Sequence, residues 1–356
     1  MKLKLAAESG YRGSIRFMLQ AASARQGKTG APAVPDEVGQ CVTTTRDGKG
    51  RTQVVVSLGK AKGMKPDTLR CAGGAIARWL RAHRETRAGV DLPPVVAAVA
   101  EGILLADYAF DRHKTQPAAR PHLAVDLLVK KPAPAQSALL RRTEHICAGV
   151  RTARDFAHEP PNVINPVTLA RQVKTLATRS GLKCTILDQK KLAEMKAGGI
   201  LGVGQGSVTP PRLIVLEYQP PAGARAKTAN AKSTKAKSAK AKPVVLVGKA
   251  ITFDTGGYSI KSKDGMLGMK YDKCGGTAVI GAMLAVAAVK PRVPVVGVIA
   301  AAENMIDGAA YRPDDIITTL SGKTVQIVSA DAEGRMVLCD AMTYAQRKYQ
   351  PRAMID

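Results

Sequence analysis

Four acidic residues near the end of the chain have the composition of a metal site. Asp254 and Asp272 lie in one short stretch, and Asp331 and Glu333 lie in a second. Carboxylate oxygens suit hard or borderline divalent ions such as Mg²⁺, Mn²⁺ and Zn²⁺. Four carboxylates around one point would not all stay ionised unless cations lay between them. Two metal ions would relieve that repulsion and would form a hydrolytic centre.

Three basic residues are interleaved with these acids, namely Lys249, Lys261 and Arg335. A buried lysine loses its proton readily and can then offer a lone pair to a metal, so Lys249 is a fifth candidate ligand. A charged amine at Lys261 could stabilise oxygen charge in a tetrahedral intermediate. The planar fork of Arg335 could hold an anion. The alternative for each of the three is a surface salt bridge.

Asp331 and Glu333 are two residues apart at a predicted strand-to-helix turn. In an extended stretch, residues i and i+2 project to the same side, so both carboxylates can face one site. The alternative is that Asp331 only caps the following helix. We favour the shared site because Asp254, Asp272 and Lys249 are all expected just past strands, at the carboxyl edge where α/β folds place ligands.

The elements that must position these residues alternate between strands and helices. The strands are expected at 53–58, 123–129, 183–187, 212–218, 244–247, 293–302 and 352–356, with a hairpin at 315–328. The helices are expected at 66–84, 93–106, 137–157, 167–180, 189–196, 276–289 and 332–348. This alternation predicts an α/β fold with a mainly parallel or mixed sheet flanked by helices.

The length of 356 residues leaves room for about two domains. A proline-interrupted linker at 130–136 divides an N-terminal α/β domain, 1–131, from a second α/β domain, 132–356. A low-complexity insert, 221–243, holds seven Lys or Arg and no acid. We interpret it as a solvated loop between two strands, with a nucleic-acid tether as the alternative.

The glycine-rich stretch 200–207 fails the dinucleotide fingerprint, and LSGKT at 320–324 fails the phosphate-loop pattern. We interpret these glycines as turns beside the active centre. No histidine spacing indicates a zinc-binding helix.

The formal net charge is +26, which favours polyanions non-specifically. Six cysteines are scattered without a CxxC pair, which indicates reduced thiols in a reducing compartment. The opening residues lack the apolar core of a signal peptide, and the apolar runs are too short to cross a bilayer. We therefore expect a cytoplasmic protein with no membrane partner.

The two stretches resemble the leucyl (cytosol) aminopeptidase family of metallo-exopeptidases. The matching motifs are Gly248–Lys249 followed by Thr252–Phe253–Asp254–x–Gly256–Gly257, Asp272 before Gly275–Gly276, and Asp331–Ala332–Glu333–Gly334–Arg335. Other stretches are also similar, among them Asn162 in PPNVINP, and the resemblance runs from about Val54 to the end.

The resemblance implies a di-metal aminopeptidase that releases N-terminal residues, leucine among them, from peptides. Two divalent ions, Mn²⁺ or Zn²⁺, would be bound by Lys249, Asp254, Asp272, Asp331 and Glu333. Lys261 would polarise the scissile carbonyl, and Arg335 would hold a bicarbonate-like anion. One metal would receive the free α-amine of the substrate. The family is usually hexameric, with the N-terminal domain as an oligomerisation-type unit.

The sequence departs from the family pattern in three places. Ser329–Ala330 replaces the usual Asn-Thr before the last motif, the basic insert is unusual, and the chain ends at Asp356 where the family continues. The competing interpretations are a nucleic-acid-binding protein on the same scaffold and an inactive truncated chain. We favour the two-domain α/β metallo-aminopeptidase.

Overall fold

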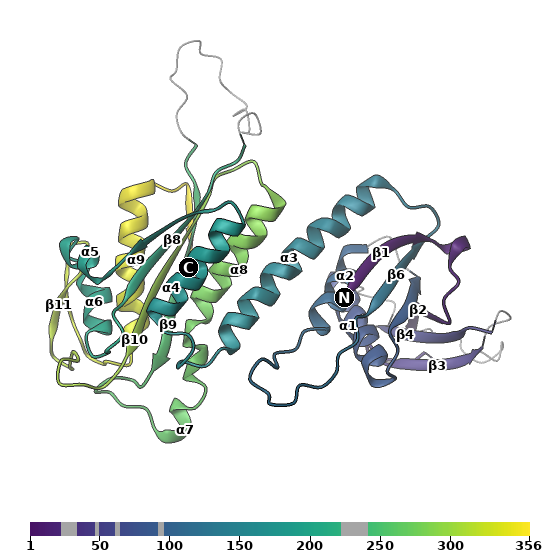
Figure 1. Cartoon of the computed structure of the whole chain (residues 1–356), viewed down its shortest axis with the longest axis horizontal. Helices are drawn as coiled ribbons and strands as arrows, with labels where there is room; N and C mark the ends of the chain where they lie inside the picture. The colour runs from purple at the N-terminus through teal and green to yellow at the C-terminus, as the bar shows by residue number, and fades with distance from the viewer. Residues whose placement is uncertain (23–33, 47–49, 61–64, 92–95, 222–240) are drawn as a thin grey trace, which may run out of the picture. The chain divides into compact units, whose positions relative to one another are not determined.

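A computed structural model describes residues 1–22, 34–46, 50–60, 65–91, 96–221 and 241–356 (Figure 1). The chain divides into two compact units, Met1–Cys147 and Ala148–Asp356. Most of the basic insert lies outside the described residues, so its interpretation stays a prediction. The six cysteines all lie among the described residues, and none of them forms a disulfide.

The first unit is built on a sheet whose strand order is β1-β6-β5-β2-β4-β3. Its strands are β1 (Lys2–Ala7), β2 (Ile15–Ala22), β3 (Cys41–Arg46), β4 (Thr52–Lys60), β5 (Arg87–Asp91) and β6 (Ala124–Val129). Neighbouring strands are parallel except for β3, which runs antiparallel to β4 at the edge. A short 3-10 helix, η1 (Glu8–Gly10), follows β1.

Two helices of the first unit, α1 (Pro66–Ala82) and α2 (Val96–Ala106), pack closely on each other. The apolar spacing of α1 buries Leu69, Ile76 and Leu80 in one core cluster with the sheet. A Cβ added to Gly102 would lie 2.0 Å from the Arg70 carbonyl oxygen. Glycine is therefore required where the two helix backbones approach.

A long helix, α3 (Pro134–His158), begins inside the predicted linker at 130–136, three residues before the helix start expected at 137. The division between the two units falls inside this helix, after Cys147. The predicted boundary at residue 131 therefore lies shortly before the helix, on the N-terminal side of the observed division.

The second unit contains a mixed sheet in the order β13-β9-β10-β8-β7. Its strands are β7 (Lys183–Leu187), β8 (Arg212–Tyr218), β9 (Val244–Asp254), β10 (Val295–Asn304) and β13 (Ala353–Ile355). Strand β9 pairs in parallel with β10 and β13, whereas β8 runs antiparallel to both β10 and β7. A separate hairpin joins β11 (Ile316–Thr318) to β12 (Thr324–Gln326).

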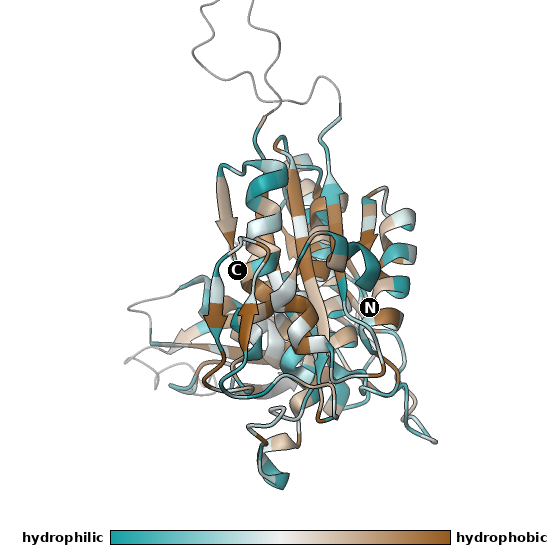
Figure 2. Cartoon of the chain, turned by 90° about the vertical axis from the view of Figure 1, so that its left-hand side faces the viewer, coloured by the Kyte–Doolittle hydropathy of each residue, from teal (hydrophilic) through white to brown (hydrophobic). Residues whose placement is uncertain are grey.

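Helices cover both faces of this sheet, and alternate strand residues fill two core clusters. One cluster joins Ile214 and Leu216 to α4 (Pro166–Arg179) and α8 (Cys274–Val289). The other joins Leu213 and Val215 to α5 (Gln189–Glu194), α6 (Gly198–Gly204) and α9 (Glu333–Tyr349). Figure 2 shows apolar strands among helices whose outer residues are hydrophilic. The predicted fold class is confirmed.

Three details differ from the sequence prediction. Residues 200–207 were expected to form a turn, but most of them belong to α6, where Ile200 and Val203 are buried in the core. Strand β9 continues beyond 247 to Asp254, because its later residues pair with β10. Strands β1, β2, β3 and β5 were not predicted.

One helical run, Lys263–Val289, is long and apolar enough by length and composition to cross a membrane. It comprises α7 (Lys263–Met266), η2 (Met269–Lys273) and α8. Helix α8 packs against β9 and β10 with Val279, Ile280 and Met283 buried. We therefore interpret it as a core helix of the second unit.

The buried carboxylate of Asp340 fixes α9 to two neighbouring segments. Its Oδ2 accepts a hydrogen bond of 3.0 Å from Ile200 N in α6, and its Oδ1 accepts one of 2.7 Å from Leu320 N after β11. Burial raises the pKa of Asp340, which shows that the backbone donors only partly offset the loss of hydration.

We expect Asp340→Ala to lower the free energy of unfolding by roughly 2–4 kcal/mol, because two buried N–H groups lose their acceptor. Urea denaturation measures the change. Glu194→Ala serves as the control, since Glu194 is exposed and pairs with Lys191 on the surface. Equal losses in the two variants would contradict the role of Asp340.

Candidate metal centre

Three of the four predicted acids meet at the carboxyl end of β9. Asp254 is the last residue of that strand, Glu333 is the first residue of α9, and Asp272 lies in η2. One carboxylate oxygen from each of the three lies within 4.8 Å of the other two. Asp254 and Glu333 are buried and Asp272 is half-buried. Asp272 was expected just past a strand, but it lies in a 3-10 helix.

Lys249 joins this cluster from within β9. Its Nζ lies 2.7 Å from Asp272 Oδ1 and 2.6 Å from Glu333 Oε1. The expectation that Lys249 follows the strand was wrong, because β9 stays paired with β10 beyond it. A Cβ added to Gly334 would lie 2.8 Å from the Lys249 side chain. The glycine after Glu333 therefore makes room for this lysine.

Lys261 reaches the same centre through a tight turn. Gly256 and Gly257 adopt positive φ values of +86° and +58°, which favour glycine. The turn closes when Lys261 N donates a hydrogen bond of 2.9 Å to the Thr255 carbonyl oxygen. Lys261 Nζ then lies 2.9 Å from Asp254 Oδ2 and in contact with Asp331 Oδ1. Lys261 thereby ties the fourth acid, Asp331, to the cluster.

The centre holds four carboxylates and two ammonium groups. Burial raises the pKa of Asp272 and of Glu333, and the charge of Asp254 raises both further. Burial opposes the charge of Lys249, but its contacts with Asp272 and Glu333 outweigh that effect and raise its pKa. The site is therefore short of positive charge.

Two buried oxygens indicate what the centre can bind. Within the described part of the chain, Asp272 Oδ2 accepts no hydrogen bond. Glu333 Oε1 accepts none of regular geometry, although Lys249 Nζ lies 2.6 Å away. Unpartnered carboxylate oxygens in an acidic, buried cluster fit hard or borderline divalent cations. The donor set present therefore suits the metal ions expected from the sequence.

Arg335 is the one predicted site residue that the structure does not bring into this cluster. It lies on the first turn of α9, and its side chain is exposed. It forms no ion pair with any residue that the structure describes. Its role with an anion stays a prediction.

Sequence reasoning missed Asn304, the last residue of β10. This buried side chain contacts Asp254 across the two parallel strands. The sequence did contain a signal for Asn304. It lies just past a predicted strand, and neighbouring parallel strands end at the same edge of a sheet, where Asp254 also lies. Ser329 is one of the two residues that differ from the family pattern before the last motif. Its Oγ accepts a hydrogen bond of 3.2 Å from Asp331 N, so this serine helps to hold the turn that carries Asp331.

The segment that carries Asp272 rests on the end of α3. Lys273 is fully buried, and its Nζ donates a hydrogen bond of 2.9 Å to the Glu159 carbonyl oxygen. Lys270 Nζ donates one of 3.1 Å to the His158 carbonyl oxygen, and the Tyr271 hydroxyl lies 2.9 Å from His158 Nδ1. Burial lowers the pKa of Lys273 to about 8.

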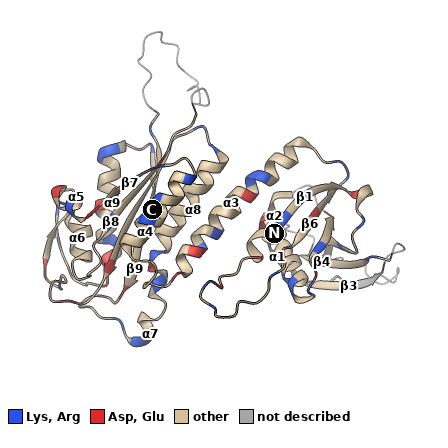
Figure 3. Cartoon of the chain, in the orientation of Figure 1, with Lys and Arg blue, Asp and Glu red and all other residues tan. Residues whose placement is uncertain are grey.

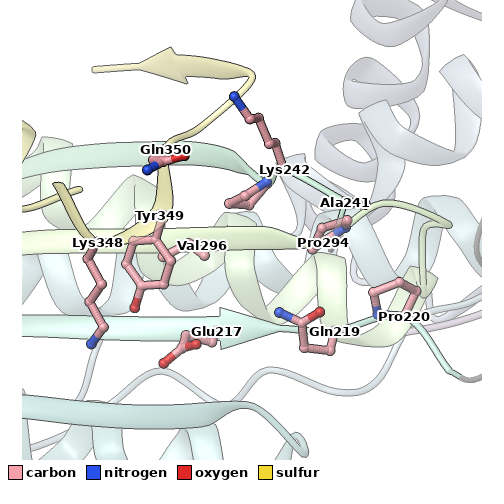
Figure 4. A pocket seen from close by; sticks show the side chains of 11 residues that line it. Glu217, Gln219, Pro220, Ala241, Lys242, Pro294, Val296, Lys348, Tyr349 and Gln350 are labelled. Carbon is pink, nitrogen blue, oxygen red and sulfur yellow. The ribbon is translucent and has the colours of Figure 1, made fainter. Parts of the chain in front are cut away.

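A cavity of about 440 Å³ lies at the other end of the sheet from the carboxylates (Figure 4). It is lined by residues at the end of β8, at the starts of β9 and β10, and at the end of α9, among them Glu217, Lys348 and Tyr349. Because β9 begins at Val244 and ends at Asp254, this cavity is separate from the metal centre.

Comparison with known proteins gives a consistent match. Residues 151–356 match the family model for the catalytic domain of the cytosol aminopeptidase family, and residues 36–117 match the model for its N-terminal domain. A probable cytosol aminopeptidase from Geobacter sulfurreducens is 42% identical over 315 residues, which cover 85% of this chain and 60% of that protein. One from Pseudomonas syringae pv. tomato is 46% identical over 264 residues, which cover 73% and 49%.

A solved structure of the bottromycin maturation enzyme BotP in complex with Mn is also similar. It has a TM-score of 0.76 and 29% identity, and the match covers 94% of this chain and 69% of that one. By comparison with the Geobacter sulfurreducens relative, the chain spans about 60% of the length of that protein.

We expect Lys261→Met, in excess chelator, to lower the free energy of unfolding by about 2 kcal/mol, because buried Asp254 loses its cation. Added Mn²⁺ should remove part of the difference, since an ion replaces the missing charge. Thermal melts with chelator and with Mn²⁺ measure both effects. Lys263→Met is the control, because Lys263 is exposed. A variant as stable as wild type in chelator would contradict this account.

Proposed function

The chain belongs to the cytosol aminopeptidase family, and from that premise we propose that it is a metal-dependent aminopeptidase acting on the N-termini of peptides. The observation that carries the proposal is the convergence of Asp254, Asp272 and Glu333 within 4.8 Å at the positions of the family motifs. The similarity to BotP, whose structure was solved with Mn, supports Mn²⁺ as an ion for this centre.

Our proposal includes two divalent ions, Mn²⁺ or Zn²⁺. Two positions in the centre already hold a positive charge between carboxylates. Lys249 Nζ lies between Asp272 and Glu333, and Lys261 Nζ lies between Asp254 and Asp331. We propose Asp272 and Lys249, the latter once it has lost its proton, as ligands on one side and Asp331 on the other, with Asp254 and Glu333 shared.

Bound divalent ions would supply a water activated at neutral pH and a Lewis acid for the substrate carbonyl. The residues of the chain would orient and stabilise the reacting groups. The ammonium of Lys261, which lies 2.9 Å from Asp254 Oδ2, would stabilise charge that develops on the carbonyl oxygen. Arg335 would hold a bicarbonate-like anion that transfers a proton.

The centre would also select the substrate. A free α-amine received there restricts cleavage to a single N-terminal residue. By family resemblance we also propose a leucine-type preference for that residue. By family resemblance we further propose a cytoplasmic homo-oligomer, as a hexamer.

A nucleic-acid-binding function has less support. Among the described residues, Lys and Arg are scattered over both units (Figure 3). The clearest basic segment of the sequence is the insert, most of which lies outside the described residues. We therefore do not extend the proposal to nucleic acid.

We expect the chain to release leucine from a leucyl amide, with activity lost on chelation and restored by Mn²⁺. Glu333→Ala should abolish hydrolysis and lower bound metal, because Glu333 contributes to both proposed ion positions. Metal analysis and a leucyl-amide assay on the same preparations decide this. Wild-type rate with a full metal complement in Glu333→Ala would refute the assignment.

We expect Lys261→Ala and Arg335→Ala to reduce kcat on the order of 10²–10³-fold while bound metal stays unchanged, because each supplies charge needed mainly in the transition state. Steady-state kinetics with parallel metal analysis provides the measurement, and exposed Lys263→Ala is the matched control. A change confined to KM would indicate ordinary substrate binding instead.

A further inference from the structure

The two carboxylate oxygens of Asp254 have different surroundings. Oδ1 accepts a hydrogen bond of 2.8 Å from Asn304 Nδ2 and one of 2.9 Å from Gly256 N. Oδ2 instead faces Lys261 Nζ at 2.9 Å. A carboxylate oxygen accepts about two hydrogen bonds, so Oδ1 is fully used. Only Oδ2 remains available to a cation.

Asn304 is placed to join the two loops that carry the candidate ligands. Its side-chain amide donates to Asp254 Oδ1 and, at 3.0 Å, to the Ala330 carbonyl oxygen. Its backbone carbonyl oxygen accepts a hydrogen bond of 3.0 Å from Thr255 N and one of 2.9 Å from Thr255 Oγ1. Asn304 is 1% exposed, so water does not compete for these contacts.

Tyr311 acts at the second loop. Its hydroxyl donates a hydrogen bond of 2.9 Å to the Ala330 carbonyl oxygen, which therefore receives two donors. Ala330 directly precedes Asp331, and both Ala330 and Tyr311 are buried. Burial also raises the pKa of Tyr311, so the hydroxyl keeps its proton and remains a donor.

We infer that Asn304 and Tyr311 are positioning residues of the metal centre. Asn304 fixes the rotation of the Asp254 carboxylate, so that Asp254 binds cations through Oδ2 alone. Asn304 and Tyr311 together hold the loop of Asp254 at a set distance from the turn of Asp331 and Glu333. The inference rests on the proposed function, because it requires that the carboxylates bind a metal.

The test measures Mn²⁺ binding to chelator-stripped protein by calorimetry. Groups that orient metal ligands typically affect metal affinity by about 10–100-fold. We expect Asn304→Ala to raise the Kd for Mn²⁺ about tenfold or more, and Tyr311→Phe to raise it less, because Ala330 keeps one donor. The double variant should lose more than the two single effects combined, because the buried carbonyl of Ala330 then loses both donors.

A spectroscopic measurement separates positioning from a general loss of stability. In Asn304→Ala, Oδ1 of Asp254 keeps only the Gly256 N donor and has a lone pair left to join Oδ2 in coordination, so the visible absorption of the Co²⁺-loaded protein should change. Ser207→Ala is the matched control. It removes a 2.6 Å hydrogen bond from Ser207 Oγ to Glu303 Oε2, and Glu303 is the residue before Asn304 on β10. We expect the control to keep its Mn²⁺ affinity within about twofold and its Co²⁺ spectrum unchanged.

Three results would overturn the inference. The first is wild-type Mn²⁺ affinity in folded Asn304→Ala, and the second is an equal loss in Ser207→Ala. The third applies if Asn304→Ala does not fold. It is an unchanged Mn²⁺ affinity and an unchanged Co²⁺ spectrum in Tyr311→Phe, a variant that keeps the buried ring. Absence of Mn²⁺ binding by the wild-type chain would instead refute the proposed function, and the inference with it.

Discussion

The architecture of the second unit depends on one electrostatic constraint, which is that four carboxylates converge where β9 ends. Such a group is unfavourable unless positive charge lies among its members. Lys249 comes from within β9 and Lys261 from a glycine turn, and each bridges two of the acids. The long β9, the 3-10 helix before α8 and the start of α9 are all placed so that these contacts form. The chemistry proposed for the protein follows from the same charge imbalance.

The sequence predicted the parts of this arrangement that depend on local patterns. Helix α1 has clear apolar periodicity, α8 is a continuous apolar run of helical length, and the site residues sit in motifs with fixed spacing. The strands of the first unit were harder to predict, because β1, β2 and β5 are recognisable only once their partners are known. Helix α6 was mistaken for a turn since its glycines suit both structures. Tertiary packing of Ile200 and Val203 decides in favour of the helix.

The side chains around the ligands were beyond sequence reasoning for a related reason. No sequence motif links Asn304 or Tyr311 to Asp254 or Asp331. Their proposed function depends on how β10 lies beside β9. Likewise, Lys249 was placed after a strand because Gly248 and Lys249 interrupt the apolar sequence of β9 after the run 244–247. Pairing with β10, and not hydropathy, sets where that strand ends.

Helix α3 begins within the first unit and ends in the second, where Lys270 donates to the carbonyl oxygen of His158, its last residue, and Lys273 to that of Glu159, the next residue. The 3-10 helix that holds Asp272 is therefore attached directly to the element that connects the units. A distortion of that end of α3 would therefore displace one candidate ligand, Asp272, while Asp254 on β9 and Glu333 on α9 keep their places. The three carboxylates belong to separate elements, so the affinity of the centre for a cation reports how well those elements keep their places within the second unit.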